Sequence, residues 1–473
     1  MLVPFRPDIT GTVRMEPVLG ALLADFETWY QPLRRPQPHF KAALAHSLKV
    51  IALNVVGATL ASDSAWVALP GRKAWYQENQ LLLGPLITHA SVETVVRFLR
   101  EEGYVRFRSG RASKSKAFRR PNLVQPSRKL RTLAQSFGAE VADIHSDPKA
   151  FPLRLRAKRD ETGSRRYIPL SITGETLIME DRVATINRVL LHHWPDLEVT
   201  DQQMEEMLGY MAKRDGSERT IDFGKRTLYR VFNNGTLEDG GRFYGGWWQE
   251  IPKAYRPYIT INGKRTVEVD YSAIHPTFLY HEVGLPKPED PYAIGLGSRE
   301  VVKRTFNALI NAKGISIKPV EGFDPEAVGM TWNEFLRRVK DRFLPFKPYF
   351  GTGYGLKLQR LDSDIAEAVM LHFAKRDIPV LPVHDSFIVH HGYEAELAMV
   401  MEDKFREVTG ASINLKPSAL STEQVVAMSD LSEAEHQRLL SQGMSEIDAL
   451  LSRDHAFGQY EARLSDWFSR KTS

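Results

Sequence analysis

Two aspartates that are far apart in the sequence each stand at the end of an apolar stretch rich in β-branched residues. Residues 266–276 read TVEVDYSAIHP, which predicts a strand that ends near Asp270 and a helix that follows it. Residues 378–389 read IPVLPVHDSFIV, which predicts a second apolar hairpin with Asp385 at its turn. Carboxylates hold Mg²⁺ in phosphate chemistry. Two strand-borne aspartates with a basic helix between them therefore predict metal-assisted phosphoryl transfer.

The segment between the aspartates that would supply positive charge is residues 299–314. Its apolar residues follow helical spacing, and Arg299, Lys303 and Asn307 fall at i, i+4 and i+8, so they share another face of the helix. A row of cations on one helix suits a triphosphate. Such a row is usually only exposed to solvent, and it is the flanking aspartates that favour a phosphate site here.

Residues 106–131 form a block of ten basic residues that contains no acidic residue. A helical pattern precedes the block, beginning at Ser91 and ending at Gly103, and a hairpin with its turn at Ser109-Gly110 follows. A helix followed by a basic hairpin resembles a winged helix-turn-helix. A block of one sign suits nucleic-acid phosphates, and a solvated basic loop is the alternative. The expected nucleic-acid contacts in the hairpin are Arg111, Lys114, Lys116, Arg119 and Arg120.

Length and composition bound the class of protein. A chain of 473 residues suggests roughly three domains at about 150 residues each. Basic residues exceed acidic ones by 63 − 58 = +5, a mild bias. The chain has no cysteine, which excludes disulfides and thiolate metal sites and makes a reducing cytosol the natural compartment. Residues 1–20 lack a signal-peptide core, and the longest apolar run, residues 50–61, is too short to span a bilayer. We expect a cytoplasmic protein, bacterial or phage-encoded, with no membrane partner.

Four blocks of the chain, in this order, resemble the polymerases built like DNA polymerase I (family A) and the related single-subunit phage-type RNA polymerases. Residues 242–252, which run from Arg242 to Gln-Glu-Ile-Pro, resemble the stretch before the palm. Asp270-Tyr271-Ser272 resembles motif A, and Arg299 with Lys303 resembles motif B. His384-Asp385-Ser386 resembles motif C and follows a helix that contains Gln359, as in the family. The resemblance covers roughly residues 225–415.

This resemblance implies a right-hand α+β polymerase fold, with an antiparallel palm sheet and helical fingers beside a mostly helical N-terminal region. Asp270 and Asp385 would bind two Mg²⁺ ions, one lowering the pKa of the primer 3′-hydroxyl and the other neutralising the leaving pyrophosphate. Arg299 and Lys303 would hold the triphosphate, and Lys303 would protonate the leaving group. The residues expected at the primer and template are Arg242, Gln249, Gln359 and His384.

The sequence also departs from the family pattern. The DNA enzymes place a glutamate, which excludes the ribose 2′-hydroxyl, where this chain has His275, and the RNA enzymes place glycine there. Asn307 and Asn311 replace the phenylalanine and tyrosine of motif B, and Ser386 follows Asp385 as in the RNA enzymes. We expect His275, Asn307 and Asn311 to line the nucleotide site, and the bulk of His275 favours DNA synthesis. The alternatives are a primase or single-subunit RNA polymerase, a non-catalytic DNA-binding replication initiator, and a metal-dependent nuclease.

Four regions are expected along the chain. Residues 1–135 are a helical, DNA-binding region with the winged-helix pattern, and residues 136–224 are a helical linker or thumb-like region. Residues 225–418 are the palm and fingers, and residues 419–473 are a C-terminal helical extension. The expected partners are a DNA template with a primer, or an RNA product, and nucleoside triphosphates.

Overall fold

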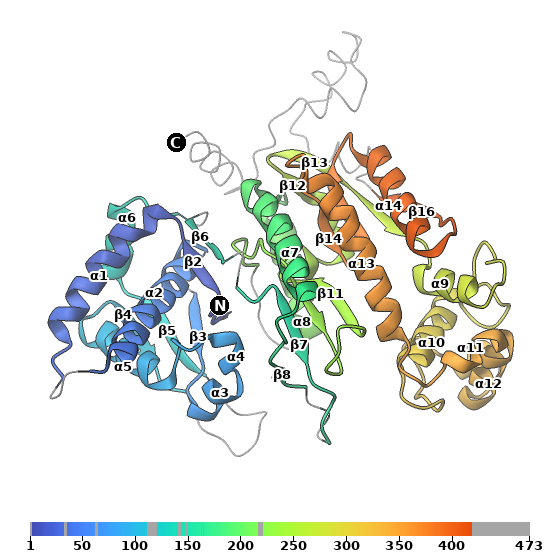
Figure 1. Cartoon of the computed structure of the whole chain (residues 1–473), viewed down its shortest axis with the longest axis horizontal. Coiled ribbons are helices and arrows are strands. Elements are labelled where there is room, and N and C mark those ends of the chain that lie inside the picture. The colour runs from blue at the N-terminus through green and yellow to red at the C-terminus, as the bar shows by residue number, and fades with distance from the viewer. Residues whose placement is uncertain are drawn as a thin grey trace, which may run out of the picture.

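A computed structural model shows the chain as two lobes, each with its own hydrophobic core. The residues that the structure describes are 2–32, 36–61, 65–110, 121–140, 143–147, 150–161, 163, 165–215 and 221–418. In Figure 1 the N-terminal lobe is mostly blue and the larger lobe runs from green to orange. Both lobes combine helices with mainly antiparallel strands, so the predicted α+β class is confirmed.

The N-terminal lobe is organised around one apolar helix, α2 (Pro38–Ala61). Residues 50–56 of α2 are all buried, as expected for a helix that is surrounded by its core. Among the described residues, its stretch Pro38–Ala58 is the one helix long and apolar enough to cross a membrane, and 61% of the tested window is buried in the lobe. The elements packed around α2 are α1 (Glu16–Trp29), α5 (His89–Glu101) and the sheet β1 (Leu2–Pro4), β3 (Trp66–Leu69), β5 (Asn122–Pro126) and β4 (Val105–Arg108).

Helix α5 is followed by the antiparallel pair β4 and β5, with Arg106 opposite Gln125. The helix begins at His89, because Thr88 rather than Ser91 is its N-cap: Thr88 Oγ1 accepts from Ser91 N, and Ser91 Oγ accepts from Thr88 N. The order of helix and hairpin is the predicted one. Residues 111–120, which hold Arg111, Lys114, Lys116, Arg119 and Arg120, lie outside the described part of the chain, so the winged helix stays a prediction.

The larger lobe contains a six-stranded sheet whose central strand, β13 (Lys264–Tyr271), carries Asp270. Four of the last six residues of this strand, Val267, Val269, Tyr271 and Glu268, are buried, because both edges of β13 pair with other strands. The other strands of the sheet are β14 (Leu381–Val383), β15 (Ser386–His390), β12 (Ile259–Ile261), β9 (Pro195–Leu197) and β16 (Leu415–Ser418). A second sheet has the strand order β11 (Gly240–Tyr244), β10 (Tyr229–Phe232), β7 (Leu153–Arg156) and β8 (Tyr167–Ile168).

Residues 153–215 are part of the larger lobe, so the predicted linker or thumb-like region at 136–224 is wrong as a separate unit. Strand β7 pairs with β10, and β9 pairs with β12. Helices α7 (Gly174–His192) and α8 (Asp201–Asp215) bury their apolar residues in the same core. The basic appearance of this stretch is misleading, because β7 alternates buried leucines with more exposed arginines.

The long helix α13 (Gly355–Ala374) packs against β11, α7 and α14 (Glu394–Thr409). Helix α9 (Ile274–Glu282) follows β13, and α10 (Arg299–Asn311) packs against α12 (Trp332–Arg342) at the far end of the lobe (Figure 1). The remaining elements are β2 (Ile9–Gly11), β6 (Ile144–Ser146), α3 (Lys73–Glu78), α4 (Gln80–Leu83), α6 (Arg128–Ser136), α11 (Pro325–Val328) and the 3-10 helices Val13–Met15, Trp247–Glu250, Lys253–Tyr258 and Leu344–Tyr349.

Candidate active site

The two predicted aspartates lie side by side on neighbouring strands. Strands β13 and β15 are antiparallel, and Asp270 is paired with Ser386, the residue after Asp385. The Tyr271 N–H donates to the carbonyl of Asp385 at 3.2 Å, which fixes the end of β13 against the turn. The sheet register therefore brings together two carboxylates that are far apart in the sequence.

Neither of these carboxylates has a hydrogen bond or ion pair with the residues that the structure describes. Burial and the negative charge of Asp385 raise the pKa of Asp270 to about 6. Two carboxylates that repel each other in a partly buried place are unfavourable unless a cation is shared between them. This pair is consequently a candidate site for a divalent cation.

The donor set fits Mg²⁺ with substrate present better than a closed protein cage. Within the described residues there is no group of three or more His, Cys, Asp or Glu side chains that would hold a metal. Mg²⁺ is commonly bound by one or two carboxylates together with water and the phosphates of a nucleotide. Asp270 and Asp385 supply the two carboxylates, and a triphosphate would supply the remaining oxygens.

The raised pKa of Asp270 predicts how stability depends on pH. Because the folded state holds the proton of Asp270 more tightly than the unfolded chain does, its contribution is present below about pH 4 and is lost as the pH rises through about 6. In urea unfolding with EDTA, we expect the D270N variant to be more stable than wild type at pH 7.5 by roughly 1–3 kcal/mol. The difference should shrink at pH 4, and Mg²⁺ should stabilise only the wild type. Parallel stability curves for the two proteins would contradict the repulsion between the aspartates.

The turns that follow or contain the aspartates both include a strained residue. His384 and Asp385 form a two-residue hairpin turn, in which His384 has φ +61°. Ala273, at the start of α9, has φ +55°. Residues other than glycine rarely adopt this conformation, and when they do it is often at a functional site. Partial burial and the charge of Arg242 lower the pKa of His384, so the ring is placed beside the aspartates largely uncharged.

Helix α10 places Lys303 near the aspartate pair. Val301, Val302, Phe306 and Leu309 are buried against the lobe, which turns the face of Lys303 outward. The charge of Lys303 opposes the rise in the pKa of Asp270. Lys303 forms no ion pair with the described residues, so it is free to bind phosphate.

Three other residues of α10 are less directly available for a nucleotide. Arg299 Nε donates to Asp290 at 2.5 Å, and the guanidinium lies 5.3 Å from the centre of the Tyr292 ring. Asn307 is half-buried on the helix. The amide of Asn311 donates to the carbonyl of Asn307 at 2.8 Å, at the end of α10. The structure therefore shows Arg299 paired with a carboxylate that a triphosphate would have to replace.

The residues expected at the primer and template differ in their surroundings. Arg242 binds the buried carboxylate of Asp362, and His275 Nε2 lies 2.9 Å from the same carboxylate. Gln249 is not free for DNA, because its amide donates to the carbonyls of Phe243 and Pro382 at 3.0 and 3.1 Å. Gln249 instead fixes strand β14. Gln359 is half-buried on α13.

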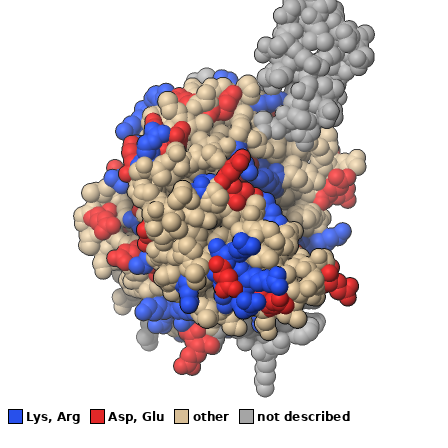
Figure 2. Space-filling view, turned by 90° about the vertical axis from the view of Figure 1, so that its right-hand side faces the viewer, with Lys and Arg blue, Asp and Glu red and all other residues tan. Residues whose placement is uncertain are grey.

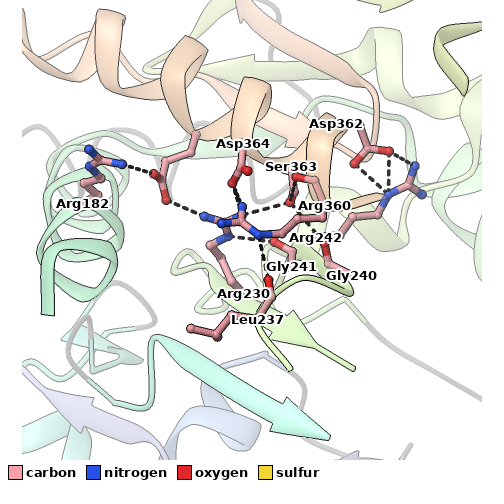
Figure 3. Close-up of polar contacts among 11 residues, drawn as sticks. Arg182, Arg230, Leu237, Gly240, Gly241, Arg242, Arg360, Asp362, Ser363 and Asp364 are labelled. Atoms are coloured by element: carbon pink, nitrogen blue, oxygen red, sulfur yellow. Dashed lines mark hydrogen bonds and ion pairs between the residues drawn. The ribbon is translucent and has the colours of Figure 1, made fainter. Parts of the chain in front are cut away.

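The sequence patterns did not single out the ion-pair network that holds α13 against β10 and β11 (Figure 3). The side chain of Arg230 is fully buried and donates to Gly241 O, Glu367 Oε2, Ser363 Oγ and Asp364 Oδ1 at 2.8–2.9 Å. Asp364 also pairs with Arg360, and Glu367 also pairs with Arg182 of α7 at 3.0 Å. Acidic residues at helical spacing on α13 were the available signal, but they look the same as a solvated helix face.

The close approach of β11 to α13 requires glycine at residue 241. Gly241 has φ +82°, and a Cβ there would lie 2.8 Å from Phe232 and 3.0 Å from Ser363 Oγ. The paired glycines at 240 and 241 thus let the strand that carries Arg242 lie against the helix that carries Asp362.

No protein-family model matches the sequence, and no curated protein matches it either. Among solved structures, the chain is similar to the POL domain of Pol1 from M. smegmatis in complex with DNA primer-template and dNTP. The sequence identity is 13%, the match covers 80% of this chain and 71% of that chain, and the TM-score is 0.30. A similarity this low does not establish a shared fold, so the function of the site has to be inferred from its own residues.

Proposed function

We propose that the chain is a template-directed nucleic-acid polymerase of the family A DNA polymerase type, with a right-hand arrangement of palm and fingers. It would transfer nucleotides from nucleoside triphosphates to a 3′-hydroxyl. The observation that supports this most strongly is the pair of unpartnered carboxylates, Asp270 and Asp385, on adjacent strands with Lys303 nearby. A partly buried, uncompensated pair of acids is costly to a fold that does not use it.

Each residue of the site has a role in the proposed reaction. Asp270 and Asp385 would hold Mg²⁺, which when bound supplies Lewis-acid stabilisation of charge on the transferred phosphoryl group. Lys303 would bind the triphosphate and stabilise its developing charge. Arg299 would join it after leaving Asp290. His384, in its strained turn, would contact the primer end.

Positive charge for DNA does not form an unbroken patch on the face that bears α10 and α12. Figure 2 shows Lys and Arg gathered on the lower half of this face, with Asp and Glu among them. On α12, Arg337 pairs with Asp341 and Arg338 pairs with Glu334. The acid-free block at residues 106–131 is therefore the better candidate for contact with the DNA backbone, and Arg106, Arg108, Arg128 and Lys129 are exposed there.

Replacing Arg111, Lys114, Lys116, Arg119 and Arg120 with glutamine is expected to weaken DNA affinity and flatten its dependence on salt. Each phosphate contact that is lost lowers the slope of log affinity against log salt by about one unit. Fluorescence anisotropy of a labelled duplex at several salt concentrations measures this slope. As a matched control, glutamines at Arg337 and Arg338 should leave it unchanged. An unaltered slope in the fivefold variant would contradict DNA contact by this hairpin.

A primase or RNA polymerase is the second candidate function. Ser386 follows Asp385, as in the RNA enzymes that this block resembles, and Ser386 Oγ binds Glu268 on the neighbouring strand. His275 stands at the position that faces the sugar in the family it resembles. These two positions are compatible with the use of ribonucleotides.

One assay separates the candidate functions. Purified full-length protein is given a labelled primer–template, Mg²⁺ and either dNTPs or rNTPs. Lengthening of the primer supports a polymerase, and synthesis on an unprimed template supports a primase. Shortening of the label indicates a nuclease. A gel shift without any chemistry indicates a DNA-binding initiator and contradicts the proposal.

A further inference from the structure

Asp362 joins three elements of the larger lobe at one buried carboxylate. Its side chain is 1% exposed and accepts hydrogen bonds from Arg242 of β11 and His275 of α9, while Asp362 itself lies on α13. The Arg242 Nε atom lies 3.2 and 3.1 Å from the two carboxylate oxygens, and His275 Nε2 lies 2.9 Å from Oδ2. Figure 3 shows the contact with Arg242 beside the Arg230 network. The network holds α13 in place, and Asp362 holds the two side chains.

The contacts at Asp362 determine which nitrogen of His275 carries the hydrogen. An ionised carboxylate only accepts, so Nε2 must donate. Arg242 already balances the charge of Asp362, and its Nη2 lies 3.3 Å from His275 Nε2, so a second positive charge on the ring would be repelled. A neutral ring that donates through Nε2 keeps its lone pair at Nδ1. None of the described residues forms a hydrogen bond with Nδ1.

His275 lies close to the aspartate pair. It is the second residue of α9 and follows Asp270 by only five positions, across the turn that contains Ala273. The side chain is 13% exposed, so part of the ring can be reached by a ligand. The charge of Asp385 contributes to the raised pKa of Arg242, which places this group of residues next to the catalytic carboxylates.

We propose that Asp362 is a positioning residue that holds His275 as a hydrogen-bond acceptor for a hydroxyl of the nucleotide sugar, so that the site takes ribonucleoside triphosphates. This inference rests on the proposed polymerase function and specifies its substrate. The ring alone, as a bulky group, would crowd a 2′-hydroxyl and exclude ribose. With Nδ1 as an acceptor, the same hydroxyl donates a hydrogen bond and the ring favours ribose.

The two effects of the ring predict opposite results, which makes the proposal testable. We would measure kcat/KM for ATP and dATP on one primer–template with Mg²⁺ in wild type and in H275F, H275A and D362N. H275F keeps the bulk of the ring and loses the acceptor. Loss of one hydrogen bond should lower the ATP-to-dATP ratio by about tenfold in H275F and H275A. D362N should lower it in the same direction, mainly through KM for ATP.

Three results would overturn the proposal. A higher ATP-to-dATP ratio in H275A means that the ring excludes ribose, and an equal loss for both nucleotides in H275F and D362N means that these residues are only structural. An unchanged ratio means that Nδ1 does not contact the sugar. The matched controls are H372F and D377N, which change side chains elsewhere on α13 and at its end and should not alter the ratio.

A measurement of binding keeps this proposal separate from the polymerase function. Isothermal titration of ATP and dATP into full-length protein with Mg²⁺ should show the same preference for ATP, and the same loss of preference in H275F. If wild type extends no primer, the polymerase function fails, but the binding ratio still supports or overturns the contact with the sugar.

Discussion

Replacing either Asp270 or Asp385 with asparagine is expected to abolish primer extension, with a loss of roughly a thousandfold or more, since a metal site of this kind supplies several kcal/mol of transition-state stabilisation. The two residues should be equally necessary, because the sheet register places them next to each other and neither has another partner among the described residues. Single-nucleotide incorporation under quenched-flow conditions measures the loss directly. DNA affinity should change little.

D377N is a matched control for both variants. Asp377 pairs with His192 at the far end of α13, its side chain is 54% exposed, and it is part of a different cluster. Extension by D377N should stay near the wild-type rate. If either D270N or D385N keeps most of its activity at saturating Mg²⁺, the assignment of the metal site is wrong. The D270N variant should still fold, because it removes a repulsive charge.

Replacing Arg230 with alanine is expected to destabilise the larger lobe by about 3–5 kcal/mol, because it leaves buried acids without their partner. Arg230 makes four hydrogen bonds from a fully buried position, and Glu367 is only 5% exposed. Burial lowers the pKa of Arg230 even though Glu367 opposes the shift, which shows how strongly this charge depends on its neighbours. Urea unfolding followed by tryptophan fluorescence measures the change in the free energy of unfolding.

Arg182 provides a matched comparison on the same carboxylate. It binds the other oxygen of Glu367 at 3.0 Å, but its own side chain is 51% exposed. An exposed ion pair is worth at most about 1 kcal/mol, so R182A should cost far less than R230A. If the two variants lose equal stability, burial of the charge is not what makes Arg230 important.

The aspartate pair could be predicted from the sequence because its signals are local. The β-branched run before Asp270 and the apolar hairpin around Asp385 each predict a strand, and two strands that end in acids predict a shared site. Helix α10 was also predictable, since Ser298 caps it and its apolar residues follow the 3.6-residue period. The observed helix ends at Asn311, three residues before the predicted end.

The remaining features depend on contacts between distant residues. Asp362 looks like one more surface acid on α13, and only Arg242 and His275, which are 120 and 87 residues away, turn it into a buried acceptor. Gln249 looks like a contact for DNA until Pro382 provides a carbonyl for it. Residues 153–215 looked like a basic linker because half of each strand faces outward, and pairing of β7 with β10 is not encoded in local sequence.

The pairing of β16 with β13 affects where the larger lobe can be cut. β16 covers the backbone of Glu268, Val269, Asp270 and Tyr271 on the side opposite β15. A shortened protein that stopped before Leu415 would leave this row of N–H and C=O groups open to another chain, and an open strand edge invites aggregation. Fragments designed for expression should therefore extend at least through Ser418, even though every residue assigned a chemical role lies before it.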